Sequence, residues 1–403
     1  MTIAVARNGR WWQSSLPPSP VTGRRSDESL PDEVRARLLT ESDAGRHTSE
    51  PDATVSEPPL DTADLDSSLK KAGPVAVGVL GFEPDSPAVF HVTRGADFTA
   101  VPVASALPAV LSSREEPSSH DYAKIVAQAL DALDSGAPDS GSDGTASRLR
   151  KVVLGRWLRI STESAVSPAD LAASLAQHNH NSTVMAVPLG GADSDAASTL
   201  VTASPELLLA RRGPSILSRP LAGSAVRASD PVEDRRRADA LLLDEKNLHE
   251  HALVVEAIRD ALGPLCTQLQ APTRPSLVGT SAMWHLATAI SGTLRADIAD
   301  HWSALHLAQL LHPTPAVAGT PRSDAMRLIS ELELEPRGPM TGAAGWVNAV
   351  GDGEFHVVIR AALVAGTATQ LFAGAGIVPG SVPVDEATET GAKLSTVLRA
   401  FGG

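Results

Sequence analysis

The strand-like segments between residues 151 and 223 constrain the fold of this chain most strongly. Four stretches rich in apolar and β-branched residues follow one another there: Lys151 to Ile160, Ser182 to Leu189, Thr199 to Arg212 and Ser215 to Gly223. Runs of this kind, bounded by Gly, Pro, Asn or Ser, predict β-strands. Any fold for this chain must therefore bury several neighbouring strands.

Helices interrupt these strands. We expect helical regions from Asp234 to Leu262 and from His301 to Leu311, and a hairpin from Gly345 to Val364 that turns at Gly351 to Gly353. Runs of strands interrupted by pairs of helices are typical of layered α+β folds and do not fit a doubly wound parallel sheet. The sequence therefore predicts the α+β class.

The first part of the chain has weaker secondary-structure patterns. Residues 1–72 are rich in Pro, Ser, Asp and Glu, which is typical of a low-complexity tail or an edge element. A strand hairpin is expected from Val75 to Val92, an amphipathic helix from Tyr122 to Leu133, and a flexible loop from Gly136 to Ser147. We expect one main domain over residues 73–403.

Composition excludes several classes of protein. The net charge of the 403 residues is −13 and no block of Lys and Arg stands out, which argues against a nucleic-acid partner. The single cysteine, Cys266, cannot form an internal disulfide, and this suits a reducing cytoplasm. No apolar run is long enough to span a membrane. We expect a cytoplasmic protein with no membrane partner.

The stretch from Leu371 to Leu398 carries the clearest candidate site. A strand-like run ends in Gly374 to Gly376, where the backbone can approach an anion closely. A helix follows in which Glu386, Glu389 and Lys393 share one face, so a hard cation could bind beside an anion. The alternative is a solvated surface pair between Glu389 and Lys393. Only six lysines occur in the chain, which makes each one notable.

Two further charged residues stand beside apolar strands. Lys151 opens a strand, where it is either a desolvated general base or an edge lysine that discourages aggregation. Glu206 follows Pro205 and precedes three leucines, so it is either a buried carboxylic acid with a raised pKa or a bend residue at the strand edge.

Glu250 and Arg360 complete the candidate site. Glu250 lies in the apolar stripe of the helix that ends at Leu262, where a divalent cation is a suitable partner, and His251 beside it is expected to pack or to support the site. Arg360 is expected on one strand face with His356 as a carboxylate clamp. Together these residues offer a base, an acid, cation ligands and a clamp, which suits a small dicarboxylate.

Eight motifs follow one another along the chain. In chain order they are KVVLGR, SPELLL, RPLAGSAVR, KNLHEH, LLHPTPAVAGTPR, the GxxGW and GDGEFHVVIR hairpin, FAGAGIV and ETGAKLSTVL. These motifs resemble those of the chorismate-utilising enzymes. The similarity runs from about Val75 to the C-terminus, and within the superfamily the chain is most similar to isochorismate synthases of the siderophore (2,3-dihydroxybenzoate) type. The resemblance implies a chorismate-binding fold, with a layered and mostly antiparallel sheet core enclosed by helices.

The resemblance also implies a role for each site residue. Lys151 would activate water and Glu206 would assist loss of a hydroxyl. Glu250 and Glu389, with Glu386 beside them, would bind Mg²⁺. The residues implied to bind chorismate are Gly223, Ser224, His312, Arg360, Gly374 and Lys393.

The implied reaction is the isomerisation of chorismate to isochorismate, for a siderophore or menaquinone route. Enzymes that add ammonia lack a lysine at the position of Lys151, and aminodeoxychorismate synthases carry one at the position of Ala222, so addition of water is favoured. Salicylate synthase, which continues to pyruvate elimination, remains an alternative, as does a silent chorismate-binding subunit. A monomer is expected by analogy, with a downstream isochorismate-using enzyme as a possible partner.

Overall fold

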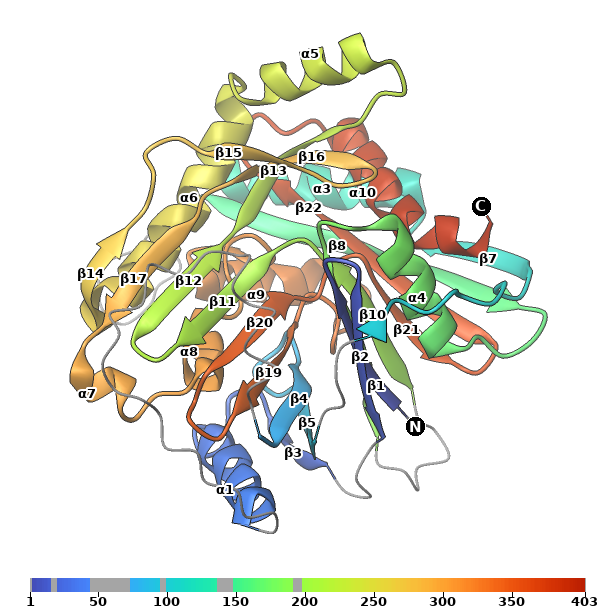
Figure 1. Cartoon of the computed structure of the whole chain (residues 1–403). Helices are drawn as coiled ribbons and strands as arrows, with labels where there is room; N and C mark the ends of the chain where they lie inside the picture. Colours follow the sequence, from blue (N-terminus) through green and yellow to red (C-terminus); the bar gives the residue numbers. More distant parts are fainter. Residues whose placement is uncertain are drawn as a thin grey trace.

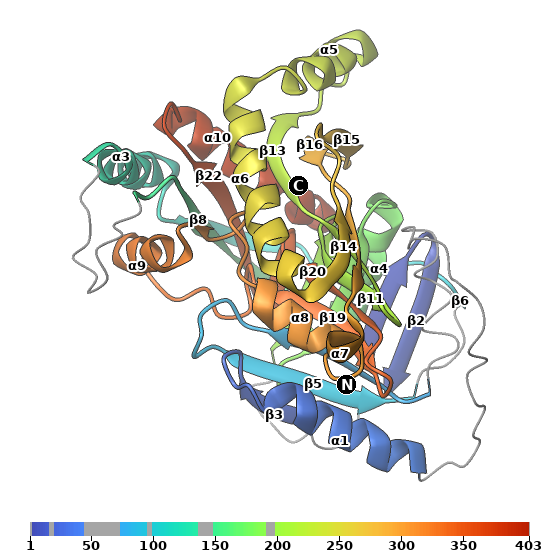
Figure 2. The same cartoon turned by 90° about the vertical axis from the view of Figure 1, so that its left-hand side faces the viewer.

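The structure is a computed structural model that describes residues 2–15, 20–43, 73–94, 99–135, 148–190 and 198–402. Within these ranges, two large sheets and one small sheet form the framework, with helices placed around them (Figures 1 and 2). Every pairing between described strands is antiparallel. The predicted α+β class with a layered antiparallel core is confirmed.

Sheet A places its strands in the order β18, β8, β22, β21, β10, β9, β1, β2 and β6, and β7 also pairs with β8. Their bounds are β1 (Thr2–Arg7), β2 (Arg10–Ser15), β6 (Thr99–Ala100), β7 (Val110–Glu116), β8 (Lys151–Thr162), β9 (Thr183–Pro188), β10 (Thr199–Ser204), β18 (Gly319–Thr320), β21 (Ala361–Ala365) and β22 (Ala368–Ile377).

Sheet B has the order β14, β17, β12, β11, β20, β19, β4, β5 and β3, and sheet C has the order β13, β16 and β15. Their bounds are β3 (Val21–Arg24), β4 (Val75–Leu80), β5 (Pro87–Thr93), β11 (Leu207–Arg212), β12 (Ser215–Arg219), β13 (Leu221–Val226), β14 (Cys266–Gln270), β15 (Ser276–Gly279), β16 (Met283–Ala287), β17 (Ile290–Leu294), β19 (Ala343–Asn348) and β20 (Gly353–Val357).

The helices lie outside the sheets, with α1 and α5 at opposite ends of the molecule (Figure 1). Their bounds are α1 (Leu30–Asp43), α3 (Ser119–Ser135), α4 (Pro168–His178), α5 (Pro231–Leu241), α6 (Glu245–Leu262), α7 (Ala296–Ala299), α8 (Ala304–Leu311), α9 (Arg322–Leu332) and α10 (Pro383–Leu398), with 3-10 turns η1 (Gly263–Leu265) and η2 (Arg399–Phe401).

Alternating side chains explain why the strand segments are almost continuously apolar. On β9, Val184 and Ala186 pack into the core beneath α4, whereas Met185 and Val187 pack into the core between sheets A and B. Because successive side chains of a strand point to opposite faces, a sheet covered on both sides needs apolar residues at every position.

The chain crosses between the two large sheets twice beside the candidate site. The predicted strand from Thr199 to Arg212 is divided at Pro205 and Glu206, since β10 belongs to sheet A and β11 to sheet B. The second crossing joins β20 to β21, and it contains Arg360 at a positive φ of 52°. The expected strand face shared by His356 and Arg360 is therefore wrong, because β20 ends at Val357.

The other elements follow the predictions with shifted ends. The early hairpin, the helix around Tyr122 and the late hairpin are confirmed. The expected helix from Asp234 to Leu262 is two helices, because the Asp244 side chain accepts a hydrogen bond from the backbone N–H of Asn247 and begins α6 there.

The remaining expectations concern the N-terminal segment and a loop. The described residues of the N-terminal segment supply β1 and β2 inside sheet A, β3 at the end of sheet B, and α1. The expected loop from Gly136 to Ser147 lies outside the described residues.

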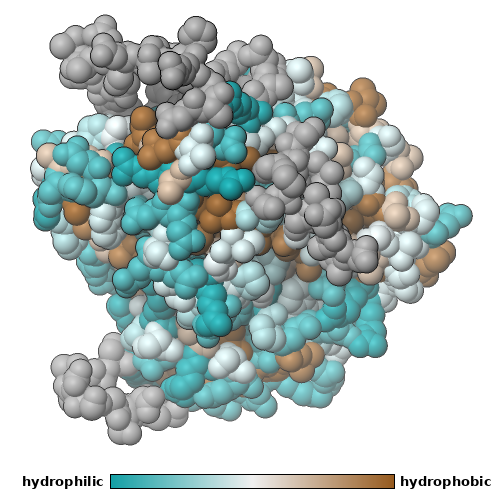
Figure 3. All heavy atoms as spheres, turned by 90° about the horizontal axis from the view of Figure 1, so that it is seen from below, coloured by the Kyte–Doolittle hydropathy of each residue, from teal (hydrophilic) through white to brown (hydrophobic). Residues whose placement is uncertain are grey.

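One face of the molecule shows how polar and apolar residues are distributed on the surface. Hydrophilic residues predominate on the face seen from the α1 end, with apolar residues in scattered groups (Figure 3). Among the described helices, none combines the length and the apolar character needed to cross a bilayer.

Gly155 on β8 gives a direct test of the packing between β8 and β22. A Cβ at this position would lie 2.0 Å from Cζ of Phe372, so Gly155→Ala forces a buried ring to move. We expect a loss of about 1–3 kcal/mol of unfolding free energy, measured by urea denaturation. Gly263→Ala is the matched control, because no described atom lies within 4 Å of its added Cβ. Equal stability of the two variants would contradict this packing.

Candidate active site

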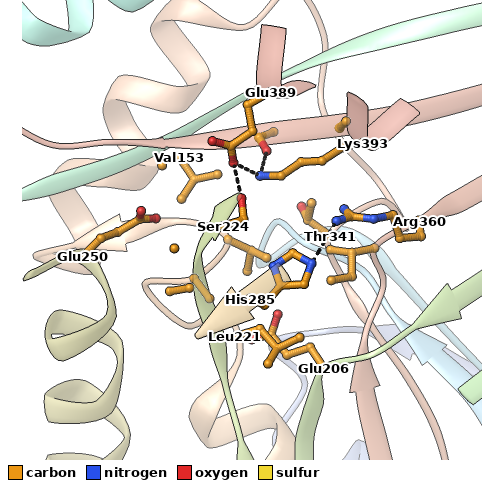
Figure 4. Close-up of a pocket in the computed structure, with 18 of the residues that line it drawn as sticks. Val153, Glu206, Leu221, Ser224, Glu250, His285, Thr341, Arg360, Glu389 and Lys393 are labelled. Carbon is orange, nitrogen blue, oxygen red and sulfur yellow. Dashed lines mark hydrogen bonds and ion pairs between the residues drawn. The ribbon is translucent and has the colours of Figure 1, made fainter. Parts of the chain in front are cut away.

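A cavity lies where the two chain crossings meet β13, β22, α6 and α10. Figure 4 shows charged side chains converging on it from these separate elements. Its polar lining consists of Glu206, Ser224, Glu250, His285, Thr341, Arg360, Glu389 and Lys393, and its glycines are Gly223, Gly374 and Gly376.

Lys151 and Glu250 form a buried ion pair at one side of the cavity. Nζ of Lys151 lies 2.9 Å from Oε1 of Glu250, and the lysine side chain is fully buried. Lys151 itself stands behind the lining, while Glu250 reaches the cavity from α6. Gly376 makes room for the pair, since a Cβ there would lie 2.0 Å from Oε1 of Glu250. The pair therefore requires glycine at position 376.

Glu206 is a buried carboxylic acid at the first crossing. Its backbone N–H donates to Oγ of Ser204 at 3.2 Å, and its side chain is almost fully buried. Burial raises the pKa of Glu206 to about 7, although Lys151 and Arg360 oppose the rise. A carboxyl with this pKa holds a proton near neutral pH, as a general acid must.

Glu389 and Lys393 are paired on one face of α10, as the spacing predicted. Nζ of Lys393 lies 2.6 Å from Oε1 of Glu389 and donates to the carbonyl of Gly374 at 2.8 Å, while Oγ of Ser224 donates to Glu389 at 2.9 Å. Burial alone would raise the pKa of Glu389, but Lys393 and Ser224 hold it below its usual range. The solvated surface pair is excluded, because both side chains line the cavity.

Glu386 lies one turn earlier on α10 and is paired with Lys246 of α6. Nζ of Lys246 is 2.5 Å from Oε1 of Glu386, whose side chain is 2% exposed. Burial, and then the negative charge of Glu389, raise the pKa of Glu386. The two α10 carboxylates are therefore near enough to repel one another.

Arg360 supplies the second cationic group of the lining. It is buried, and burial lowers its pKa to about 10. Its Nη2 lies 3.4 Å from Nε2 of His285 on β16. Burial, followed by the charges of Arg360 and Lys393, holds the pKa of His285 well below its usual value, so this ring is neutral. A guanidinium and an ammonium thus face a cavity that also contains hydrogen-bond donors and acceptors.

The oxygen donors fit a hard divalent cation. Glu250, Glu386 and Glu389 offer carboxylates, and each is balanced by one lysine. In the described part of the chain, no three acidic, histidine or cysteine side chains converge closely enough to form a ready metal cage. Magnesium is usually held by one or two protein carboxylates together with water and substrate oxygens, so this arrangement remains suitable for it.

His312 is the predicted substrate-binding residue that the cavity does not contain. Its ring is fully buried and packs edge-on against Phe82, with centroids 6.3 Å apart. Its carbonyl accepts a hydrogen bond from Arg25 at 2.9 Å. His312 is therefore not among the residues that line the cavity, and its contact with the substrate stays a prediction.

Three residues of the site were missed by sequence reasoning. They are Lys246, His285 and Thr341. The scarcity of lysine could have identified Lys246, which occurs one turn before Glu250 on the same helix face. Thr341 has a positive φ of 57°, which the sequence does not reveal.

The raised pKa of Glu206 gives a pH test of stability. Its folded pKa of about 7 lies above the ordinary 4.5, so ionisation penalises the folded state increasingly as pH rises from 4.5 through 7. Glu206→Gln removes this penalty. The unfolding free energy of this variant, relative to that of the wild type, should therefore increase by up to about 3 kcal/mol as the pH is raised from 5 to 8. The surface variant Glu163→Gln is the control in the same urea titrations. If the difference in unfolding free energy between Glu206→Gln and the wild type does not change with pH, the raised pKa of Glu206 is refuted.

Comparison with known proteins gives the family. The model for "Chorismate binding enzyme" matches residues 96–402. Isochorismate synthase DhbC of Bacillus subtilis is 44% identical over 287 residues, which cover 71% of this chain and 69% of the relative. The vibriobactin-specific isochorismate synthase of Vibrio cholerae is 39% identical over 335 residues, covering 82% of this chain and 80% of the relative.

Similar solved structures support the same family. A structure from Bacillus anthracis, described as a 2,3-dihydroxybenzoate-specific isochorismate synthase, DhbC, superposes with a TM-score of 0.83 at 34% identity and covers 99% of this chain and 95% of that one. Anthranilate synthase component I of Streptococcus pneumoniae shares the fold, with a TM-score of 0.67 at 20% identity over 98% of this chain and 89% of that one. This chain belongs to the chorismate-binding enzyme family.

Proposed function

We propose that the chain is an isochorismate synthase, an isomerase that converts chorismate to isochorismate. The observation that carries the proposal is a buried acid, Glu206, with a pKa of about 7 in a cavity that also contains Arg360 and Lys393. Chorismate carries carboxylates and a hydroxyl leaving group, which suit a cavity that offers cationic side chains and one proton donor. The relatives from Bacillus subtilis and Vibrio cholerae described above are both named isochorismate synthases.

The proposed chemistry divides between Lys151 and Glu206. Lys151 takes a proton from the water that adds at C2 of the ring, and Glu206 gives a proton to the hydroxyl that leaves C4 as the double bonds shift. One water enters and one leaves, so the reaction is an isomerisation. Because Lys151 is paired with Glu250 in this structure, its amine acts as a base only after that ion pair opens.

Substrate binding is proposed for the remaining lining residues. Arg360, Lys393 and the backbone at Gly374 would hold the enolpyruvyl carboxylate, since a guanidinium and an ammonium bind carboxylates strongly. Gly223 and Ser224 would lie against the ring carboxylate. Gly223 has a φ of +78°, and a Cβ there would stand 3.0 Å from Cβ of Asn247, so β13 approaches α6 closely at this residue.

Magnesium is proposed as the cofactor, with Glu250 and Glu389 as ligands and Glu386 beside them. When bound, the ion would neutralise and orient the ring carboxylate of the substrate. The fit of hard oxygen donors to a hard cation supports this assignment.

The location, oligomeric state and downstream partner of the enzyme are also proposals. We infer a cytoplasmic monomer whose product passes to an isochorismate-using enzyme. A siderophore or menaquinone route would consume the product, since one relative is named vibriobactin-specific and a similar solved structure is named menaquinone-specific. The division into residues 1–72 and a catalytic domain of residues 73–403 is likewise a prediction.

Product analysis tests the function directly. The protein is incubated with chorismate and Mg²⁺, with and without a chelator, and the products are separated by chromatography. Isochorismate that forms with Mg²⁺ and disappears with the chelator is the expected result. Salicylate with pyruvate would identify a salicylate synthase, and chorismate binding without turnover at any Mg²⁺ concentration would identify a silent binding subunit.

Lys151→Ala tests the assigned base. Turnover should fall by about 10²–10⁴-fold, the usual contribution of general acid–base catalysis, while chorismate binding measured by calorimetry is largely retained. Lys124→Ala, which removes an exposed lysine paired with Asp121 on α3, is the matched control. Turnover that survives in Lys151→Ala would contradict the role.

A further inference from the structure

Thr341 is a polar residue of the catalytic cavity that has no role in the proposed reaction. It lies in the turn before β19, is 4% exposed, and has a φ of 57°. A β-branched side chain rarely adopts this left-handed backbone conformation. Conformations of this kind persist where the surrounding structure imposes them, and they gather at functional sites. The contacts that hold Thr341 in place therefore indicate what it does.

The backbone of Thr341 is held against the crossing that carries Arg360. Its N–H donates to the carbonyl of Val358 at 2.9 Å, and the N–H of Val358 donates to the carbonyl of Gly342 at 2.8 Å. Val358 lies two residues before Arg360, between β20 and β21. Figure 4 shows Thr341 on the Arg360 side of the cavity, away from Glu250. These hydrogen bonds fix Thr341 beside the guanidinium that is proposed to hold the enolpyruvyl carboxylate.

The side chain of Thr341 is fixed by Arg337. Nη1 of Arg337 donates to Oγ1 of Thr341 at 3.2 Å. The arginine side chain is fully buried, and its other hydrogen bonds go to the carboxylate of Glu333 and to the carbonyls of Val153 and Val317. These bonds, one from Nε and two from each Nη, occupy all five N–H groups of a guanidinium. The position of Arg337 is therefore fixed, and so is the donor that Oγ1 of Thr341 receives.

The direction of this hydrogen bond decides what the Thr341 hydroxyl can offer. A guanidinium has donors and no acceptor, so Oγ1 of Thr341 accepts from Arg337 and its O–H points elsewhere. Among the described residues, none accepts a hydrogen bond from this O–H. A buried donor without a protein acceptor is completed by a ligand or by water. Because Thr341 lines the cavity, its O–H is available to a molecule bound there.

We propose that the Thr341 hydroxyl is a substrate-binding group that donates a hydrogen bond to the carboxylate held by Arg360. This role rests on the proposed function, in which that group is the enolpyruvyl carboxylate of chorismate. A carboxylate accepts up to about four hydrogen bonds, so a guanidinium and an ammonium leave room for a hydroxyl donor. Lys393 is already engaged with Glu389 and with the carbonyl of Gly374, whereas the Thr341 O–H has no described acceptor to give up.

Chorismate binding by matched variants of Thr341 tests this role. Thr341→Val keeps the shape of the side chain and removes the hydroxyl, whereas Thr341→Ser keeps the hydroxyl. Calorimetry uses the full chain with chorismate and a chelator, so that the substrate is not converted. Thr341→Val should bind chorismate about tenfold more weakly than the wild type, or weaker still, the usual effect of losing a hydrogen bond to a charged group. Thr341→Ser should bind nearly as tightly as the wild type.

Two further variants keep the test decisive. Thr341→Gly replaces Thr341→Val if the valine variant does not fold, because glycine adopts a positive φ without strain and also lacks the hydroxyl. It should bind chorismate as weakly as Thr341→Val. Thr267→Val, on β14 and outside the cavity lining, removes a hydroxyl that donates to the carbonyl of Thr293. It is the matched control and should bind as the wild type does.

Steady-state kinetics with Mg²⁺ identifies the substrate group that the hydroxyl contacts. Thr341→Val should raise KM and leave kcat nearly unchanged, because the hydrogen bond is made equally in the bound substrate and in the transition state. In Thr341→Val/Arg360→Gln, the loss of kcat/KM should be smaller than the product of the two single losses, since both side chains bind one carboxylate.

Three results would overturn the role of Thr341 while leaving the proposed function in place. Thr341→Val and Thr341→Gly could bind chorismate as tightly as the wild type, Thr341→Ser could lose as much affinity as Thr341→Val, or the two losses of kcat/KM could multiply in the double variant. A wild type without saturable chorismate binding would overturn the proposed function, and the role of Thr341 with it.

Discussion

Charge compensation at the boundary between the two large sheets is the constraint on which the site depends. Removing an ionised group from water is costly unless an opposite charge or strong hydrogen bonds replace the lost solvation. Glu250, Glu386 and Glu389 meet this requirement with one lysine each, at 2.5 to 2.9 Å. Glu206 forms no ion pair with a described residue, and burial raises its pKa to about 7, so it can hold a proton near neutral pH. The same requirement is therefore met by ion pairs at three glutamates and by a raised pKa at the fourth.

The chain crossings explain why these charges meet. At Pro205 and Glu206 the backbone leaves sheet A for sheet B, and at Arg360 it returns. Proline interrupts the ladder, and the positive φ of Arg360 is an uncommon conformation for a residue with a side chain. The backbone at both breaks is still hydrogen-bonded, since the N–H of Ala203 donates to the carbonyl of Arg360 at 3.1 Å and the N–H of Val357 donates to the carbonyl of Glu206 at 3.2 Å. The site therefore occupies a place where the regular strands end.

The sequence predicted much of the fold because its patterns are local. Periodicity located the strands and helices, and the i, i+3, i+7 spacing of Glu386, Glu389 and Lys393 placed them on one helix face, as found. The division of one apolar run into β10 and β11 could not be read from it, since both halves continue the same apolar pattern. For the same reason Arg360 was assigned to a continuous strand.

Local patterns in the sequence could not predict pairings between residues that lie far apart along the chain. Lys246 on α6 and Glu386 on α10 are 140 positions apart, and only the fold reveals that they form an ion pair. His312 belongs to a motif that resembles one of the family's motifs, yet its ring packs against Phe82. A residue in such a motif can serve the packing of the chain as well as contact with a ligand. The family resemblance supplied roles for Lys151 and Glu206 that their spacing alone left open.

The account requires the base and the acid to act on opposite faces of one ring held between them. A crystal structure of the protein with isochorismate and Mg²⁺ measures this most directly. We predict that Nζ of Lys151 is released from Glu250 and lies near the C2 hydroxyl, with the Glu206 carboxyl near C4 on the other face. A ring bound elsewhere, or one with both residues on the same face, would contradict the account.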